Sequence, residues 1–296
     1  MADDRAYWRS EELGEAKPLL DRGNVRYHER GSGPPLVFVH GALVNANLWR
    51  NVVARLAPDF RCIVLDMPFG AHAEALPGDA DLSPPAVADL VADAIEALGL
   101  EDVTLVGNDT GGAICQLVVT RRPERIGRLV LTSCDAFDNF PPKMMQPAMP
   151  LLRLPGVLTA MLAPTRSRAV RNRVFGLFAK RPVEQEALDS YALPAARDRG
   201  VRRDVKKFLV GLDKRHTLEA AERFGDFRKP VLIAWSRKDK VFPQDYGERL
   251  ASAFPEGRLE WIDDSFFLSP EDRPDRVAEL IGGFVREPAA AHASET

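Results

Sequence analysis

The stretch Val103-Thr-Leu-Val-Gly-Asn-Asp-Thr-Gly-Gly112 decides the fold of this chain. It opens with an apolar run typical of a buried strand, passes through small and polar residues, and leads into a segment that favours a helix. A strand, a sharp turn and a helix in this order are the context of the nucleophile elbow, usually written G-x-S-x-G. Gly107 and Gly111 occupy the glycine positions, and Asp109 stands where the serine is expected.

A carboxylate at the centre of such a turn indicates a particular chemistry. An aspartate is ordinarily ionised at neutral pH, so Asp109 would attack as a nucleophile without a base to deprotonate it. The product is an ester on the enzyme, which a second step must break. Alternatively, Asp109 caps the N-terminus of the following helix, where backbone N–H groups stabilise negative charge. The flanking glycines and the preceding buried strand favour catalysis.

Composition limits the functional classes. The chain has 296 residues, of which 45% are hydrophobic and 28% charged, and its formal net charge is -3. This length supports a sizeable core with an inserted subdomain, and this charge gives no strong attraction to nucleic acid or membranes. The charged N-terminus and the absence of long apolar runs predict a cytoplasmic protein with no membrane partner. The cysteines are expected to be buried thiols. No metal or organic cofactor is predicted, and the oligomeric state stays open.

Buried strands alternate with helical stripes on both sides of the elbow. This alternation predicts an α/β fold with a mostly parallel, doubly wound sheet. The pattern stops between residues 136 and 216, which are rich in Pro, Met, Phe and Arg and show helical periodicity. We therefore predict a core formed by residues 1–135 and 217–296, with a helical cap at residues 136–216. Residues 25–30 are predicted to be an edge strand.

The order of these motifs resembles that of the α/β-hydrolase superfamily over nearly the whole chain. The resemblance depends on His40-Gly41 after the first buried strand, on the elbow at 107–111, and on Trp235-Ser-Arg-Lys-Asp239 followed by Pro243. An aspartate at the elbow is similar to the branch that holds haloalkane dehalogenases and epoxide hydrolases. In that branch the aspartate attacks carbon, and a histidine–acid pair activates the water that cleaves the ester.

The resemblance implies a role for each matching residue. Asp109 would be the nucleophile, and the backbone N–H groups of Ala42 and Thr110 would form the oxyanion hole. Asp239 would be the orienting acid, and Asp135 stands at the other position where this branch places an acid. Phe266 occupies the position of the catalytic histidine. Because phenylalanine accepts no proton, the usual base is absent, and losing a positioned base costs about 10²–10⁴-fold in rate.

Other residues leave alternatives open. His72 follows the strand that ends at Asp66 and is a candidate replacement base, although a surface histidine is the simpler interpretation. Thr110 stands where dehalogenases commonly carry a halide-binding Trp, and Tyr191 is the one tyrosine of the predicted cap where epoxide hydrolases use two. The basic residues of the cap are interpreted as a solvated helix face, with an anionic substrate group as the alternative.

Two functions follow from these observations. The first is a hydrolase that acts through Asp109 on an ester, epoxide or carbon–halogen bond of a small or medium hydrophobic substrate. The second is a non-hydrolytic protein, either a lyase or cyclase with Asp109 as general base or a ligand-binding pseudoenzyme. A proton acceptor beside Asp109 favours the first function, and remote histidines with Phe266 sealing the site favour the second.

Overall fold

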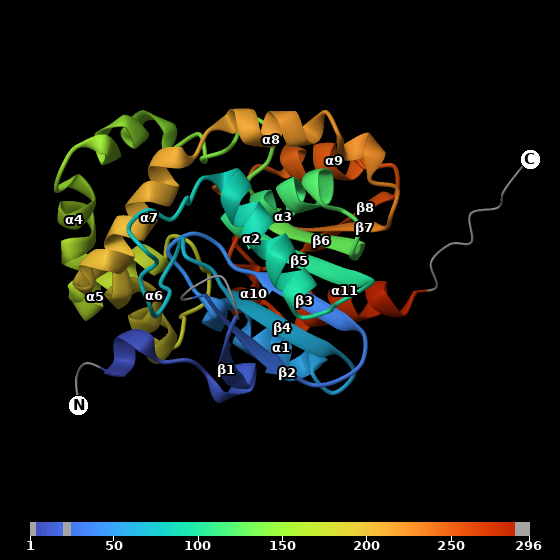
Figure 1. The fold of residues 1–296 in the computed structure, drawn as a ribbon, viewed down its shortest axis with the longest axis horizontal. Coiled ribbons are helices and arrows are strands. Elements are labelled where there is room, and N and C mark those ends of the chain that lie inside the picture. The colour runs from blue at the N-terminus through green and yellow to red at the C-terminus, as the bar shows by residue number, and fades with distance from the viewer. Residues whose placement is uncertain (1–3, 20–24, 288–296) are drawn as a thin grey trace, which may run out of the picture.

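A computed structural model of the chain describes residues 4–19 and 25–287. An eight-stranded sheet runs through the molecule in the order β1-β2-β4-β3-β5-β6-β7-β8 (Figure 1). The first three strands of that order pair antiparallel, and all other neighbours pair parallel. The strands are β1 (Glu15–Pro18), β2 (Arg26–Arg30), β3 (Pro35–Val39), β4 (Arg61–Asp66), β5 (Val103–Asp109), β6 (Ile126–Cys134), β7 (Val231–Ser236) and β8 (Gly257–Ile262).

The mostly parallel sheet predicted from the sequence is confirmed. Its central strands are buried on both faces because they carry continuous apolar runs, as in Leu36-Val-Phe-Val39. The strand predicted at residues 25–30 exists, but its edge position is wrong. β1 covers its outer side, because the polar N-terminal segment supplies a further short strand.

Helices cover both faces of the sheet. Helix α1 packs against α11, and α3 packs against α2, β5 and β6, with the sheet between the two groups (Figure 1). Helix α2 begins after Ser83 with Pro84 in its first turn, as its sequence predicts. The core helices are α1 (Arg50–Leu56), α2 (Pro84–Ala97), α3 (Thr110–Arg121), α9 (Gln244–Ala253), α10 (Ser269–Asp272) and α11 (Pro274–Arg286), with 3-10 turns at η1 (Asp4–Tyr7), η2 (Glu11–Leu13) and η3 (Ala46–Trp49).

The chain between β6 and β7 is helical throughout. Its elements are η4 (Gln146–Arg153), α4 (Val157–Leu162), η5 (Ala163–Arg166), α5 (Arg168–Phe175), α6 (Gln185–Arg197), α7 (Arg199–Gly211), α8 (Lys214–Ala221) and η6 (Phe224–Asp226). Helices α4, α5 and α7 lie beside one end of the sheet, on the left of Figure 1. Helix α8 crosses the predicted cap boundary at residue 216 and packs against α3. The division into core and cap stays a prediction.

Buried polar contacts hold α6 to the core. Arg50 of α1 donates to Glu271 at 2.6 Å, and the hydroxyl of Tyr191 donates to the same carboxylate at 2.5 Å. Asn45 and Asn47 both bond to Ser190. Removing one member of such a network leaves a buried group unsatisfied, so these contacts fix the position of the helix. The hydroxyl of Tyr191 is therefore engaged in a structural contact.

Candidate active site

Asp109 lies at the turn between β5 and α3. Its backbone has φ 53° and ψ −131°, a conformation that residues with a Cβ rarely adopt. The residue is half-buried, in contrast to the fully buried residues on either side of it. A strained turn that brings one polar side chain to an accessible position is the arrangement that the elbow sequence predicts.

The glycines of the elbow are needed for space. Neither Gly107 nor Gly111 has a positive φ, so the strain falls on Asp109 alone. A Cβ on Gly111 would lie 2.3 Å from the carbonyl oxygen of His40, and one on Gly107 would lie 2.7 Å from the carbonyl oxygen of Gly111. A Cβ on Gly41 would lie 2.3 Å from Oδ2 of Asp109. The glycines let helix α3 and the loop after β3 approach the turn.

Backbone N–H groups surround the Asp109 carboxylate. The N–H of Ala42 donates to Oδ2 at 3.0 Å, and the N–H of Thr110 also favours the charged carboxylate, since it lowers the pKa of Asp109. These are the two groups that the sequence assigned to an oxyanion hole. They act at the start of α3, where the helix dipole also favours negative charge.

Two further aspartates accompany Asp109. Asp135 is fully buried after β6, where its Oδ2 accepts from the hydroxyl of Thr110 at 3.2 Å and its Oδ1 has no hydrogen-bond partner in the described chain. Asp239 follows β7, and its Oδ1 accepts from the N–H groups of Val241 and Phe242 at 2.8 and 3.0 Å. Its Oδ2 is buried and accepts no hydrogen bond from the described residues.

All three carboxyl groups have a pKa above the ordinary value for aspartate. The pKa of Asp109 is raised to about 7. Burial is the largest cause, the N–H groups of Thr110 and Ala42 lower the pKa, and the negative charge of Asp239 raises it. Burial likewise raises the pKa of Asp239 to about 6. The pKa of Asp135 lies well above its usual range because of burial and the charge of Asp109. A pKa of about 7 leaves Asp109 only about half ionised at neutral pH, whereas an ordinary aspartate is fully ionised there.

Phe266 lies in the loop between β8 and α10. Its N–H donates to Asp272 at 2.8 Å, and its carbonyl oxygen accepts from the hydroxyl of Ser236 at 2.7 Å. The half-buried ring lies 4.6 Å from the ammonium group of Lys240. These bonds fix the backbone at the position that the resemblance assigns to a catalytic histidine.

His40 supports the loop after β3. Its Nε2 accepts from the N–H of Met67 at 2.9 Å, so Nδ1 carries the proton and donates to the carbonyl oxygen of Gly41 at 2.8 Å. Burial lowers the pKa of this histidine to about 4. His40 is thus a neutral residue that fixes the loop carrying Gly41 and Ala42.

His72 is buried, so the surface location expected for it is wrong. Its Nε2 lies 3.4 Å from Oδ2 of Asp204 on helix α7, and this oxygen also accepts from the N–H of Leu76 at 2.7 Å. Its Nδ1 has no hydrogen-bond partner among the described residues. The contacts tie His72 to the helical segment, and within residues 4–19 and 25–287 no histidine hydrogen-bonds to Asp109.

Sequence reasoning missed the role of Asn108. Its side-chain amide donates to the hydroxyl of Thr132 at 2.9 Å and to the carbonyl oxygen of Phe267 at 2.8 Å. The elbow is therefore bonded directly to the loop that carries Phe266. An amide inside an apolar strand indicates a buried hydrogen-bonding group, but the sequence does not show which residues bond to it.

Metal-ligand groups, free cysteines and membrane-crossing helices also bear on function. Within the described ranges, no group of three or more His, Cys, Asp or Glu side chains is arranged to hold a metal ion. The three cysteines, Cys62, Cys115 and Cys134, are buried and free, as predicted. In the part of the chain that the structure covers, no helix is long and apolar enough to cross a membrane.

The fold and this site define an α/β protein with a carboxylate at the nucleophile elbow. The chain belongs to the alpha/beta hydrolase fold family, which matches residues 34–274. It is 30% identical over 295 residues to an uncharacterised protein of Mycobacterium tuberculosis, covering 93% of this chain and 84% of that protein. It is 28% identical over 272 residues to haloalkane dehalogenase 2 of the same species, covering 88% and 91%.

Solved structures agree on the fold. The haloalkane dehalogenase DbeA from Bradyrhizobium elkani superposes with a TM-score of 0.76 at 20% identity, covering 92% of this chain and 96% of that one. An α/β hydrolase fold protein from Burkholderia ambifaria gives a TM-score of 0.77 at 20% identity, covering 90% and 98%. The chain thus has the alpha/beta hydrolase fold, and a haloalkane dehalogenase among its relatives supports a hydrolase at the level of the family.

Proposed function

We propose that this chain hydrolyses a small or medium hydrophobic substrate with Asp109 as its nucleophile, cleaving an ester, epoxide or carbon–halogen bond. The observation that supports this most is the contact between Oδ2 of Asp109 and the N–H of Ala42, at 3.0 Å. If the other oxygen attacks, Oδ2 becomes the carbonyl oxygen of the ester. It later carries the negative charge of the tetrahedral intermediate, which the same donors stabilise.

The first step needs an ionised and accessible carboxylate. With a carbon–halogen or epoxide substrate, Oδ1 of Asp109 forms a bond to the saturated carbon, the bond from that carbon to the halide or the epoxide oxygen breaks, and the departing atom takes the electron pair. With an ester substrate, Oδ1 bonds to the carbonyl carbon, the alkoxide leaves, and the covalent intermediate is a mixed anhydride. The half-buried positions of Asp109, Ala42 and Leu43 support access by a small molecule. The pKa of about 7 means that this step accelerates as the pH rises through neutrality.

The second step needs a proton acceptor for water. We propose that Asp239 takes this role in place of the absent histidine. Its Oδ1 is held by two backbone N–H groups, its Oδ2 is unpartnered within the described chain, and its charge acts on Asp109. With a pKa of about 6, it is mostly ionised at pH 7 and above. Water attacks Cγ of the ester and Oδ2 of Asp239 accepts its proton. The bond between Cγ and Oδ1 then breaks, Asp239 returns the proton to the departing alkoxide, and the alcohol leaves while the Asp109 carboxylate is regenerated with one oxygen from water.

Mass spectrometry of the Asp109 peptide tests both steps. The protein is incubated with 1-bromobutane, styrene oxide or p-nitrophenyl butyrate in H₂¹⁸O at pH 8. Turnover through a covalent ester places ¹⁸O in the Asp109 carboxylate, and a blocked second step leaves a stable adduct there. Neither label nor adduct with any probe, while product still forms, would contradict nucleophilic attack.

A matched pair of variants separates the role of Asp239 from general charge effects. Asp239→Asn is expected to keep the adduct and slow its loss by at least about 10²-fold, the usual contribution of a positioned base. Asp263→Asn removes an exposed carboxylate from the neighbouring loop and should change neither rate. If the Asp109 adduct is lost at the same rate in the Asp239→Asn variant and in the wild type, Asp239 is excluded as the base.

One observation favours a second function. A carboxyl group with a pKa of about 7 is well matched to proton abstraction near neutral pH, and Phe266 leaves the site without the usual imidazole. A lyase or cyclase would use Asp109 as a general base, with no bond to substrate. In that case Asp109→Ala abolishes turnover, while the Asp109 peptide of the active protein gains neither adduct nor ¹⁸O.

A further inference from the structure

The charge of this protein is unevenly distributed. Residues 136–216 contain 16 Lys and Arg against 7 Asp and Glu, a net charge of +9. The rest of the chain contains 24 against 36, a net charge of −12. The overall value of −3, which led us to expect no membrane partner, therefore hides a basic helical segment attached to an acidic core. Such asymmetry is typical of proteins that bind an anionic surface.

The same segment exposes apolar side chains. Among the described residues, eight large hydrophobic side chains are exposed, and six of them lie between residues 144 and 177. The six are Met144, Met145, Leu151, Leu154, Met161 and Leu177. Single exposed apolar residues need no explanation, but a concentration of them in one short segment marks an interaction surface.

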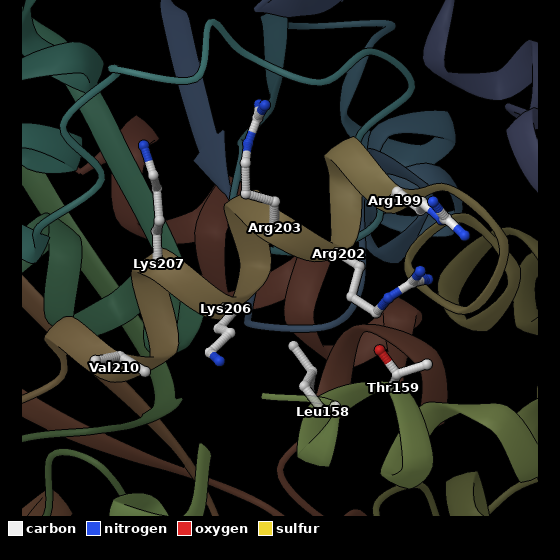
Figure 2. Close-up of a pocket in the computed structure, with 9 residues that line it drawn as sticks. Leu158, Thr159, Arg199, Arg202, Arg203, Lys206, Lys207 and Val210 are labelled. Carbon is white, nitrogen blue, oxygen red and sulfur yellow. The ribbon is translucent and has the colours of Figure 1, made fainter. Parts of the chain in front are cut away.

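A cavity of about 390 Å³ lies between α4 and α7, and both helices contact η4, the element that carries exposed Leu151. Leu158 and Thr159 of α4 line one side, and Arg199, Arg202 and Lys206 of α7 line the other (Figure 2). The ammonium group of Lys206 donates to the carbonyl oxygens of Arg153 and Leu154 at the end of η4. The exposed end of η4 therefore adjoins the basic helix.

The positive charges of this cavity are not neutralised within the described chain. Arg202 and Lys206 donate to backbone carbonyl oxygens, which carry no net charge, and Arg199 makes no ion pair or hydrogen bond with any residue that the structure describes. Arg203 and Lys207 differ, because they reach across to the loop around residues 76–80. Three cations thus stay available at the mouth of the cavity.

We propose that this surface docks on a lipid bilayer with anionic headgroups. The cap patch is defined by Leu151, Leu154 and Met161 together with Arg199, Arg202 and Lys206. Exposed apolar side chains beside uncompensated cations are the combination that inserts into the headgroup boundary of an anionic membrane. The protein would lie on the bilayer, in agreement with the lack of a membrane-crossing helix in the described ranges.

Other occupants fit the patch less well. A second copy of the patch would bring two segments of +9 together, which like-charge repulsion opposes. Nucleic acid or free phosphate would match the cations but would leave the three apolar side chains in water. The proposal is independent of the chemistry at Asp109, because the patch residues belong to η4, α4 and α7 and none of them contacts that carboxylate.

Vesicle co-sedimentation tests the proposal. The full chain is mixed with phosphatidylcholine vesicles that contain either no phosphatidylglycerol or 30 mol% of it, at low and at 1 M salt. We expect binding to the anionic vesicles only, weakened by salt because the Debye length falls to about 3 Å at 1 M. Binding that is equal for both vesicles, or absent from both, would overturn the proposal.

Two pairs of variants locate the contact. Arg199→Glu reverses one free charge and should lower the partition coefficient about 30-fold, whereas Arg228→Glu, an exposed arginine of the core, should not change it. Leu154→Ser with Met161→Ser should lower it about tenfold per side chain, whereas Leu218→Ser on α8 should not. Unchanged binding in the patch variants, with near-UV circular dichroism confirming their folds, would overturn the proposal.

Three further readouts identify a different occupant. Size-exclusion chromatography in which the Leu154 and Met161 substitutions dissociate an oligomer would show that the patch is a self-interface. Thermal stabilisation by inorganic phosphate without vesicle binding would assign the cavity to a soluble anion. Binding to a duplex oligonucleotide without vesicle binding would assign it to nucleic acid. Each of these results contradicts docking on a bilayer.

Discussion

Replacing Phe266 by histidine should restore a fast second step. The backbone at this position is held by Asp272 and Ser236, so the new side chain starts from the same place as the old one. Asp239 offers a buried oxygen with no donor among the described residues, and an imidazole N–H is the donor that such an oxygen lacks. The site then contains the acid and base that water activation requires.

The expected gain in the rate of ester hydrolysis is large compared with the stability lost by removing the phenyl ring. A positioned general base contributes about 10²–10⁴-fold, and Asp239 already supplies at least about 10² of this in the proposed mechanism, so we expect Phe266→His to speed loss of the Asp109 ester by up to about 10²-fold. The phenyl ring is half-buried and lies 4.6 Å from the ammonium group of Lys240, so the change removes one cation–π contact of about 0.5–1 kcal/mol. The nearby ammonium favours neutral imidazole, which is the form that accepts a proton.

The assay is a single-turnover experiment at pH 8. Protein is first alkylated with a small excess of 1-bromobutane, and intact mass then follows the decay of the adduct. Phe266→Leu serves as the control, because it removes the ring without adding a base. Decay at the same rate in Phe266→His and Phe266→Leu would refute the reasoning that an imidazole at this position activates water better than Asp239 alone.

Further predictions concern groups that shape the site. The rate of Asp109 alkylation should rise about tenfold from pH 6 to pH 8 and then level off, because its pKa is about 7; a pH-independent rate would contradict this. Because the pKa is raised, ionised Asp109 destabilises the fold above pH 7, so Asp109→Asn should stabilise the protein there by up to about 4 kcal/mol and should not stabilise it below pH 3.8. Urea unfolding of both proteins above pH 7 and below pH 3.8 would show this difference. Gly41→Ala places a Cβ 2.3 Å from the carboxylate, so alkylation should slow by about 10²-fold, whereas Gly283→Ala, where the Cβ meets nothing within 4 Å, should not change the rate. Asp204→Ala removes the acceptor for His72 and should lower the free energy of unfolding by about 2–4 kcal/mol; a loss below 0.5 kcal/mol would show that the contact is not structural.

The local sequence was sufficient to predict the structure where a side chain contacts mostly residues close to it in the chain. The buried strands and the turn at 107–111 were predicted because apolar runs and glycines act over a few positions. The position of the N–H of Ala42 beside Asp109 also agrees with the motif, since the carboxyl ends of β3 and β5 lie side by side in the sheet. The predicted edge strand failed because polar residues 15–18 carry little strand signal.

Contacts between distant segments could not be predicted from the sequence. Nothing near His72 indicates Asp204, which lies 132 positions away, and nothing near Asn108 indicates the carbonyl of Phe267. The sequence by itself determined the sheet and the strained turn at Asp109. Only the tertiary structure decided that Asp109 shares its surroundings with two other acids, and so holds a proton near neutral pH, because a pKa depends on burial and on charges that the fold brings together.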